Sequence, residues 1–342
     1  MFLINIKMNK RKKILITGGA GFIGHNLALK LKKLNYNVEI VDSLNVNNIY
    51  NLKKNENKLP YPKLALKILK QRFLLLKKNK IKLNIIDIKD FKKINRYVKK
   101  FKPEVVIHLS AVSHAARSNK DPQHTFDNSL VTLQNMLEIT KNNIKQFIFL
   151  SSSMVYGNFK EKNVKEDQEC KPIGIYGALK FSAEKLIKGY SQVYDLPYTI
   201  IRPSALYGER CISRRVGQIF IESALNNARI FINGDGKERL DFTYIDDLIN
   251  GIICALKSKN SIKETFNITY GNSKSINFLL DRLKKEFPKT QVCYVKRDKL
   301  MPVRGTLNIN KAKKLINFSP KWSLNKGYPK YVKWYKEIYK MI

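Results

Sequence analysis

The chain has 342 residues, of which 44% are hydrophobic, so it can form one large α/β unit or two domains. Its formal net charge of +38 at pH 7 would suit a polyanionic partner such as nucleic acid or an acidic membrane surface. Lysine and asparagine are abundant along the whole chain, however, and no nucleic-acid motif interleaves aromatic residues with the lysines. We therefore attribute the high net charge to compositional drift. We expect weak electrostatic steering of anionic substrates as a by-product, and no nucleic-acid partner.

No apolar run approaches the roughly 20 residues that span a bilayer, so no membrane partner is expected. The N-terminal MFLINIKMNKRKK places apolar residues before basic ones, which is the reverse of a signal peptide. The four cysteines show no CxxC pairing and no metal-like spacing with the four histidines. These features favour a cytoplasmic protein with reduced thiols and no metal site.

Predicted strands alternate with predicted helices through the first part of the chain. KILIT at 13–17 is a buried strand, GGAGFIG opens a helix, and VEIVD at 38–42 is the next strand. A lysine- and asparagine-rich stretch follows, with the amphipathic segment LALKILKQRFLLL inside it. Further strands are predicted at 82–88, 105–111, 147–153 and 198–208, and helices within 124–142 and 178–190. This alternation predicts an α/β fold with a Rossmann-type doubly wound parallel sheet. From about residue 205 the pattern is irregular, and we expect the second half to pack directly on the first.

A glycine-rich loop stands between the first strand and the first helix. Gly18, Gly21 and Gly24 would let the backbone approach a pyrophosphate, whose charge the helix N-terminus favours. Asp42 ends the next strand, where its carboxylate can accept a hydrogen bond from a ribose 2′-hydroxyl and repel a 2′-phosphate. The spacing therefore predicts a dinucleotide site that prefers NAD to NADP.

Four neighbouring positions complete the expected cofactor site. Phe22 and Ile23 belong to the glycine-rich loop itself. Asp87 ends the segment NIID, with Ile88 beside it, and Asp87 could contact the adenine or cap a helix N-terminus equally well.

The segment IYGALK places a tyrosine and a lysine four positions apart, on one face of a helix. A lysine cation beside a phenol lowers the pKa of the phenol, and a phenolate near neutral pH is a general base. The same spacing occurs at Tyr50, Tyr156 and Tyr270. Only Tyr176 is followed by a convincing helical pattern, so we predict Tyr176 as the base and Lys180 as its partner.

Together, GGAGFIG, Asp42, HLSA, SSSMVYG and YGALK resemble the extended short-chain dehydrogenase/reductase family, in its NAD-dependent sugar epimerase/dehydratase branch. GDGKERLDFTYIDDL at 234–248 is similar to the family's nucleotide-sugar loop, and MPVRGTL and KAKKLINFSPKW to its C-terminal region. The resemblance covers nearly the whole chain. It implies an NAD-binding Rossmann-type domain at 1–204 and a smaller α/β domain, mainly 205–342, for a nucleoside diphosphate sugar, with interleaved segments.

The same resemblance assigns the catalytic roles to Ser152, Tyr176 and Lys180. It also implies that Tyr176 and Lys180 contact the cofactor, with Lys180 holding the nicotinamide ribose. Ser152 follows a strand at the sheet edge where ligands bind in open α/β folds, although a serine there could simply cap the strand end. In the related 4,6-dehydratases an Asp-Glu pair follows the catalytic residue. This chain has Ser153 and Met154 there, and methionine cannot transfer a proton, so no dehydration is expected.

The family's phosphate contacts are only partly retained. At the position of the family's nucleotide-contacting asparagine this chain has Ala205. The family has an arginine directly before Asp-Phe, whereas Arg239 of this chain lies one place earlier, and on a strand that shift turns the side chain to the opposite face. Arg304 keeps its place in the R-x-T segment and is the expected phosphate ligand, with a surface arginine as the alternative. Arg214 and Arg215 are further candidates.

These features predict an NAD-dependent nucleotide-sugar epimerase, acting at C4 through a 4-keto intermediate with tightly bound NAD. The alternatives are an NAD-dependent dehydrogenase or 4-keto reductase on a similar sugar, and a non-catalytic polyanion-binding protein. The family also usually forms a homodimer through the helices near 128–142 and 177–194, which we expect here.

Overall fold

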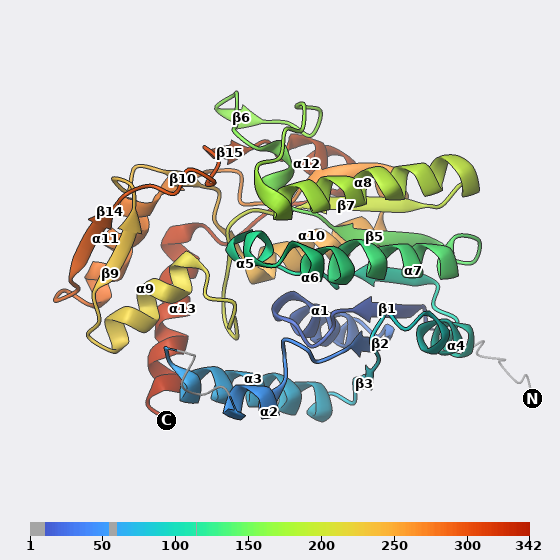
Figure 1. Ribbon diagram of the computed structural model, residues 1–342, viewed down its shortest axis with the longest axis horizontal. Coiled ribbons are helices and arrows are strands. Elements are labelled where there is room, and N and C mark those ends of the chain that lie inside the picture. The colour runs from blue at the N-terminus through green and yellow to red at the C-terminus, as the bar shows by residue number, and fades with distance from the viewer. Residues whose placement is uncertain (1–10, 55–59, 114) are drawn as a thin grey trace, which may run out of the picture.

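The computed structural model describes residues 11–54, 60–113 and 115–342. Its centre is a seven-stranded parallel sheet with the order β3-β2-β1-β4-β5-β7-β12 (Figure 1). The chain runs outward from β1 to β3 and then returns to β4, so the strand order reverses between β1 and β4, where open α/β sheets bind ligands. This arrangement confirms the predicted doubly wound sheet. The strands are Lys13–Thr17 (β1), Asn37–Asp42 (β2), Lys82–Ile85 (β3), Val105–His108 (β4), Gln146–Leu150 (β5), Tyr198–Arg202 (β7) and Glu264–Asn267 (β12).

Helices cover both faces of the sheet (Figure 1). Alternate residues of a strand point to opposite faces, so Ile14 and Ile16 of β1 join one buried cluster while Leu15 joins the other. The first cluster includes α1 (Phe22–Lys33), α3 (Pro62–Lys78) and α10 (Ile245–Lys257), and the second includes α4 (Phe91–Phe101), α7 (Thr132–Thr140) and α8 (Gly174–Tyr194).

The remaining elements are shorter or lie in the second half of the chain. The helices are α2 (Ile49–Lys54), α5 (Ala115–Lys120), α6 (Pro122–Phe126), α9 (Val216–Leu225), α11 (Ile276–Glu286), α12 (Asn310–Ile316) and α13 (Leu324–Tyr339), with a π-turn η2 (Asp127–Val131) and 3₁₀ turns η3 (Ser153–Tyr156) and η4 (Lys259–Ser261). The strands pair in twos: β6 (Asn163–Val164) with β15 (Thr306–Leu307), β8 (Leu206–Tyr207) with β11 (Thr243–Tyr244), β9 (Ile230–Asn233) with β14 (Val292–Val295), and β10 (Arg239–Leu240) with β13 (Lys274–Ser275).

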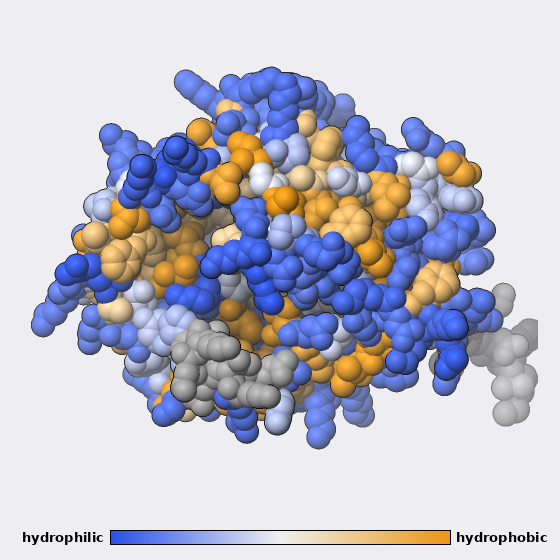
Figure 2. All heavy atoms as spheres, viewed as in Figure 1, coloured by the Kyte–Doolittle hydropathy of each residue, from blue (hydrophilic) through white to orange (hydrophobic). Residues whose placement is uncertain are grey.

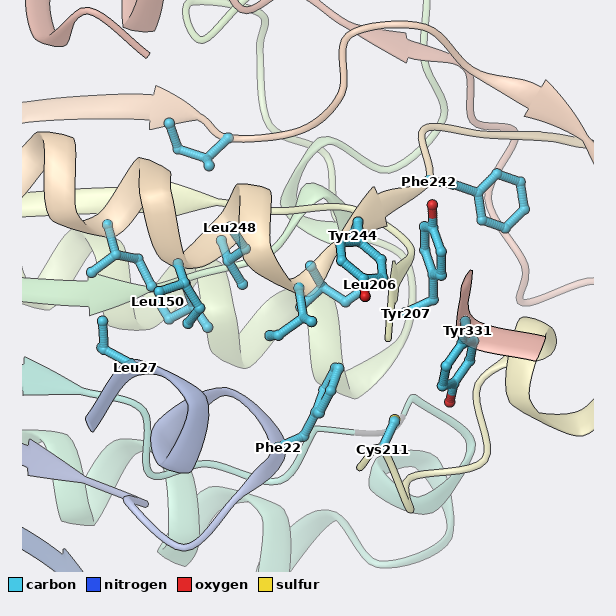
Figure 3. Packing of buried hydrophobic residues seen from close by; sticks show 14 of the residues in the cluster. Phe22, Leu27, Leu150, Leu206, Tyr207, Cys211, Phe242, Tyr244, Leu248 and Tyr331 are labelled. Atoms are coloured by element: carbon cyan, nitrogen blue, oxygen red, sulfur yellow. The ribbon is translucent and has the colours of Figure 1, made fainter. Parts of the chain in front are cut away.

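The second half of the chain packs directly on the first. Phe22 of α1 and Leu206 belong to one buried cluster, which continues through Tyr207 and Tyr244 to Tyr331 of α13 (Figure 3). The ring centroids of Tyr207 and Tyr244 are 5.4 Å apart. Since β12 joins the sheet from far beyond residue 204, the two parts also share chain segments. The division of the chain at residue 204 stays a prediction.

One predicted strand is divided. The segment 198–208 forms β7 and then β8, which leaves the main sheet to pair with β11. Pro203 follows β7 and has no N–H to donate to a neighbouring strand, so pairing stops there.

Hydrophilic residues are spread over the whole visible face rather than gathered in one stripe (Figure 2). This distribution is what compositional drift would produce. Within the three described ranges, no helix combines the length and the apolar character that a membrane crossing needs.

Candidate active site

The glycine-rich loop lies at the reversal of the strand order. Gly18 has a φ of +66°, and a Cβ on it would lie 3.0 Å from backbone atoms of Leu109 and Ser110, just after β4. A Cβ on Gly24 would lie 2.5 Å from the carbonyl oxygen of Gly18. Both positions therefore require glycine, for conformation in one case and for close packing in both.

The N-terminus of α1 is open to an anionic ligand. Gly21 is its N-cap residue, and no side chain of the described chain caps the first turn. The backbone amides of Phe22 and Ile23 therefore lie at the positive end of a 12-residue helix. The Phe22 side chain itself is buried in the core. This open helix end and the bare glycine backbone fit the pyrophosphate of NAD.

Asp42 ends β2 beside this loop and is buried, at 7% exposure. Its carboxylate accepts hydrogen bonds from the backbone N–H groups of Leu44 (2.8 Å) and Ala20 (3.0 Å), one on each oxygen. The carboxylate has about four acceptor sites, so it keeps one for a ribose hydroxyl beside these amides and the Asn47 side chain. Burial raises the pKa of Asp42, and the hydrogen bonds from Leu44 and Ala20 oppose that rise.

Asp87 and Ile88 follow β3, the outermost strand. Asp87 accepts a hydrogen bond from the N–H of Lys89 at 3.0 Å, which closes a turn. The N-cap of α4 is Asp90, whose side chain accepts from the N–H of Lys93. A helix cap is therefore not the role of Asp87, and its contact with an adenine stays a prediction. Ile88 is buried, at 3% exposure.

Helix α8 carries the predicted base and its lysine. The helix starts two residues before Tyr176, so Tyr176 and Lys180 lie one turn apart on it, as the sequence predicted. The rival Tyr50 also lies on a helix, α2, but its side chain is 73% exposed. The rival Tyr156 is fully buried and donates a hydrogen bond to Asn267 Oδ1 at 2.8 Å. Tyr50 therefore has no buried surroundings that fix its side chain, and Tyr156 is closed to a substrate.

Ser152 is the N-cap residue of η3, and its hydroxyl accepts a hydrogen bond from the N–H of Met154 at 3.2 Å. Its side chain is also close enough to Tyr176 to oppose the rise of the pKa of that phenol. Ser152 therefore caps a local turn, and its catalytic role stays a prediction.

Burial controls the protonation of Tyr176. It raises the pKa of the phenol, while the Arg215 cation and the Ser152 hydrogen bond oppose that rise. The sequence predicted that Lys180 would lower this pKa. In the chain itself the net shift of the Tyr176 pKa is upward instead, because the cost of desolvating a phenolate exceeds the gain from nearby donors and cations.

The Lys180 ammonium points at the sheet. Nζ donates to the carbonyl oxygen of Leu150 at 2.7 Å and lies 4.8 Å from the centroid of the Phe149 ring. Burial lowers the pKa of Lys180 to about 8, and the carboxylate of Glu184 opposes that fall. The amine is therefore mostly charged at pH 7 and able to change protonation in the range where enzymes work.

A buried ion pair fixes α8 to the sheet. Glu184 lies one turn beyond Lys180 and accepts from Arg202 Nε at 2.9 Å and Nη2 at 2.6 Å. The Ser151 hydroxyl also donates to Glu184, at 2.5 Å. The two charged side chains are 1% and 3% exposed. Sequence reasoning missed this pair. The helical spacing after Lys180 was the available signal for Glu184, and nothing in the sequence pairs it with Arg202.

Two of the predicted phosphate ligands have unused donors. Arg304 Nε and Arg215 Nε are buried and have no hydrogen-bond partner among the described residues. The pKa of Arg304 is lowered to about 10, mainly by burial, with the Glu238 carboxylate opposing the fall and the Arg215 cation adding to it. Arg215 acts electrostatically on Tyr176 as well, so its guanidinium lies within range of both side chains.

The other two candidates are engaged within the protein. Arg214 Nη1 lies 3.3 Å from a carboxylate oxygen of Glu222. Arg239 donates to the Ser273 hydroxyl at 3.1 Å and to the Ser273 carbonyl oxygen at 2.5 Å. Arg215 therefore lies within electrostatic range of both Tyr176 and Arg304, whereas Arg214 and Arg239 have protein partners.

Comparisons with known proteins identify the family of this chain. The family model for the NAD dependent epimerase/dehydratase family matches residues 14–269. A putative UDP-glucose 4-epimerase of Methanocaldococcus jannaschii is 33% identical over 94% of this chain and 98% of that protein. A UDP-glucuronate 4-epimerase of Thermodesulfobacterium geofontis is 31% identical over 96% and 97%. The crystal structure of a UDP-glucuronic acid 4-epimerase from Bacillus cereus, in complex with UDP-glucuronic acid and NAD, aligns with a TM-score of 0.82 and 30% identity over 96% of this chain and 100% of that one. A match of this extent shows that the chain belongs to the NAD-dependent epimerase/dehydratase family.

Proposed function

We propose that the protein is an NAD-dependent epimerase that inverts C4 of a nucleoside diphosphate sugar. The observation that carries this proposal is the placement of Tyr176 one turn before Lys180 on α8, where the Lys180 amine is buried and donates to the carbonyl oxygen of Leu150 at 2.7 Å. Ser152 and Arg215 are close enough to Tyr176 to oppose the rise of its pKa. The relatives that are named as 4-epimerases of UDP-glucose and UDP-glucuronate support the choice of reaction and of substrate class.

Tyr176 and Ser152 act on the sugar hydroxyl. Ser152 orients the 4-hydroxyl, and Tyr176 accepts its proton as the C4 hydrogen leaves as hydride. NAD supplies the hydride acceptor and later the donor, and it is regenerated in each cycle. The 4-keto sugar turns over before Tyr176 returns the proton to its 4-oxygen, so that the hydride that bound NAD would supply reaches the opposite face of C4. The Lys180 cation stabilises the phenolate during this exchange.

Arg304 and Arg215 bind the diphosphate. Both carry a buried, unused Nε–H, and guanidinium groups match phosphate oxygens in charge and in geometry. Holding the diphosphate at a distance from the ring leaves the sugar free to rotate, which an epimerase requires. Arg214 and Arg239 contribute less, since each already has a protein partner.

Asp42 accepts a hydrogen bond from the ribose 2′-hydroxyl of NAD, and the backbone at Gly18, Gly21 and Gly24 lies beneath the pyrophosphate.

We also propose that the protein acts as a cytoplasmic homodimer through the surface of α7 and α8. Val193 and Tyr194 at the end of α8 are 72% and 42% exposed, which supports a partner there.

A single experiment tests the reaction. The purified protein is incubated with UDP-glucose or UDP-glucuronic acid, and the sugar is followed by NMR, with NADH absorbance recorded in parallel. The epimer should accumulate without net change in NADH. Net production or consumption of NADH in proportion to the sugar would identify a dehydrogenase or reductase instead.

A further inference from the structure

Arg72 is a fully buried arginine in an otherwise lysine-rich helix. It lies in α3, between β2 and β3, and is 1% exposed. Its Nε and Nη2 both donate to the carbonyl oxygen of Arg210, and its Nη1 donates to the carbonyl oxygen of Ala20 at 3.3 Å and to Asn47 Oδ1 at 3.0 Å. All these acceptors are neutral, so none of these hydrogen bonds neutralises the buried cation.

Asp42 is the carboxylate nearby that acts on this cation. Burial lowers the pKa of Arg72 to about 10 and raises that of Asp42, and each charge opposes the effect of burial on the other. Asn47 lies between the two, because its Oδ1 accepts from Arg72 Nη1 and its side chain helps to lower the pKa of the Asp42 carboxyl. Asn47 is itself 8% exposed. The peptide unit of Ala20 makes a second bridge, with its N–H on Asp42 and its carbonyl oxygen on Arg72.

We infer that Arg72, acting through Asn47 and Ala20, is a positioning residue that keeps Asp42 ionised and oriented and thereby sets the preference for NAD over NADP. The inference rests on the proposed role of Asp42 as the ribose ligand. A carboxyl that is desolvated tends to take up a proton. A protonated Asp42 would accept a ribose hydroxyl less well and would not repel a 2′-phosphate, and the Arg72 cation acts together with the Leu44 and Ala20 amides to maintain both effects.

Arg72 also connects this acid to the loop that leads to the proposed diphosphate ligands. Its other acceptor, Arg210, donates from Nε to His25 Nε2 at 3.0 Å and from Nη2 to Asn26 Oδ1 at 2.8 Å. His25 Nδ1 lies 2.8 Å from the carbonyl oxygen of Gly21, so Nδ1 carries the proton and Nε2 accepts. This polar network therefore contacts the glycine-rich loop at both of its ends, through Arg72 at Ala20 and through His25 at Gly21.

The test compares equilibrium binding of NAD and of NADP to the full chain, by calorimetry, for a set of variants. Arg72→Met removes the cation at similar length, and Asn47→Ala removes only the bridge. Arg72→Lys restores the charge, and Lys70→Met removes a charge from the exposed side of the same helix as a control. Asp42→Ala tests the ribose ligand itself.

We expect the ratio of the NADP to the NAD dissociation constant to fall about tenfold in Arg72→Met and Asn47→Ala, which is about 1.4 kcal/mol. Arg72→Lys should recover part of it, and Lys70→Met should keep the original ratio. An equal loss of affinity for both nucleotides would show that Arg72 only supports the loop, and it would overturn the inference, as would an unchanged ratio in Arg72→Met and Asn47→Ala. If Arg72→Met does not fold, Asn47→Ala and Arg72→Lys decide. An unchanged ratio in Asp42→Ala would instead refute the proposed ribose ligand and the inference with it.

Discussion

The buried pair of Glu184 and Arg202 gives the sharpest prediction about the catalytic helix. Arg202→Met removes the cation and leaves the Glu184 carboxylate buried with only the Ser151 hydroxyl as a donor. The substitution also removes the guanidinium that lies 4.7 Å from the centroid of the Tyr156 ring. Because Glu184 lies on α8, any movement that relieves the uncompensated charge also moves Tyr176 and its neighbours.

The magnitude follows from the geometry. Removing one partner of a buried ion pair costs about 3–5 kcal/mol, since an unpaired charge is left in a medium of low polarity. Both side chains here are almost completely buried and joined by two hydrogen bonds, which places the cost of Arg202→Met in that range. Replacing both residues by apolar ones of similar size leaves no charge behind, so Glu184→Leu with Arg202→Met should cost less than Arg202→Met alone.

The assay is urea unfolding of the single and double variants at pH 7, with Lys185→Met as a control for loss of an exposed charge on the same helix. The control should change the free energy of unfolding by less than about 0.5 kcal/mol. A cost below about 1 kcal/mol for Arg202→Met, or two costs that simply add in the double variant, would refute the idea that this pair is a coupled buried charge.

Three further predictions concern function. Tyr176→Phe should lower turnover by about 10²–10⁴ and leave NAD binding intact, whereas Tyr156→Phe, which loses a buried hydrogen bond to Asn267, should act on stability; near-normal turnover of Tyr176→Phe would disprove the mechanism. No 4-keto-6-deoxy sugar should accumulate from any UDP-hexose by NMR, because Ser153 and Met154 occupy the dehydratase acid positions. Duplex DNA should bind no more tightly than the non-specific range of about 10⁻⁴–10⁻⁶ M at physiological salt; nanomolar binding in a filter assay would revive the polyanion-binding alternative.

Local patterns predicted the sheet and the catalytic helix because the physical causes are themselves local. The spacing of Tyr176 and Lys180 fixes their common face once a helix forms, and α8 does form there. The glycines could be assigned because a strand, a tight turn and a helix follow one another within a few residues. Gly24 is then required by packing against atoms of the same loop, and Gly18 by its positive φ and by the backbone just after β4.

Charge partners could not be predicted in the same way. Glu184 and Arg202 meet because α8 lies over β7, and Arg72 reaches Ala20 and Asn47 because α3 folds back over the glycine-rich loop. Such contacts depend on how whole elements pack, and a chain with many cations offers many equally good pairings by sequence. A lone arginine among lysines was the available sign for Arg72, since a guanidinium offers several donors in a fixed planar arrangement.

The protonation of Lys180 shows the same dependence on burial and has a measurable consequence. Its pKa falls from the ordinary 10.5 to about 8, so the unfolded chain holds more protons than the folded one between these values. The contribution of Lys180 to the free energy of unfolding therefore rises with pH across that window. The Lys180 cation, which supports the Tyr176 phenolate, is lost above about pH 8. Turnover of the unmodified protein should accordingly fall as pH rises past about 8. In Lys180→Met turnover should be lower at pH 7, should lack this fall and should recover partly in alkali. Stopped assays across pH 6–10 decide the matter, and an identical fall in Lys180→Met would show that another group causes it.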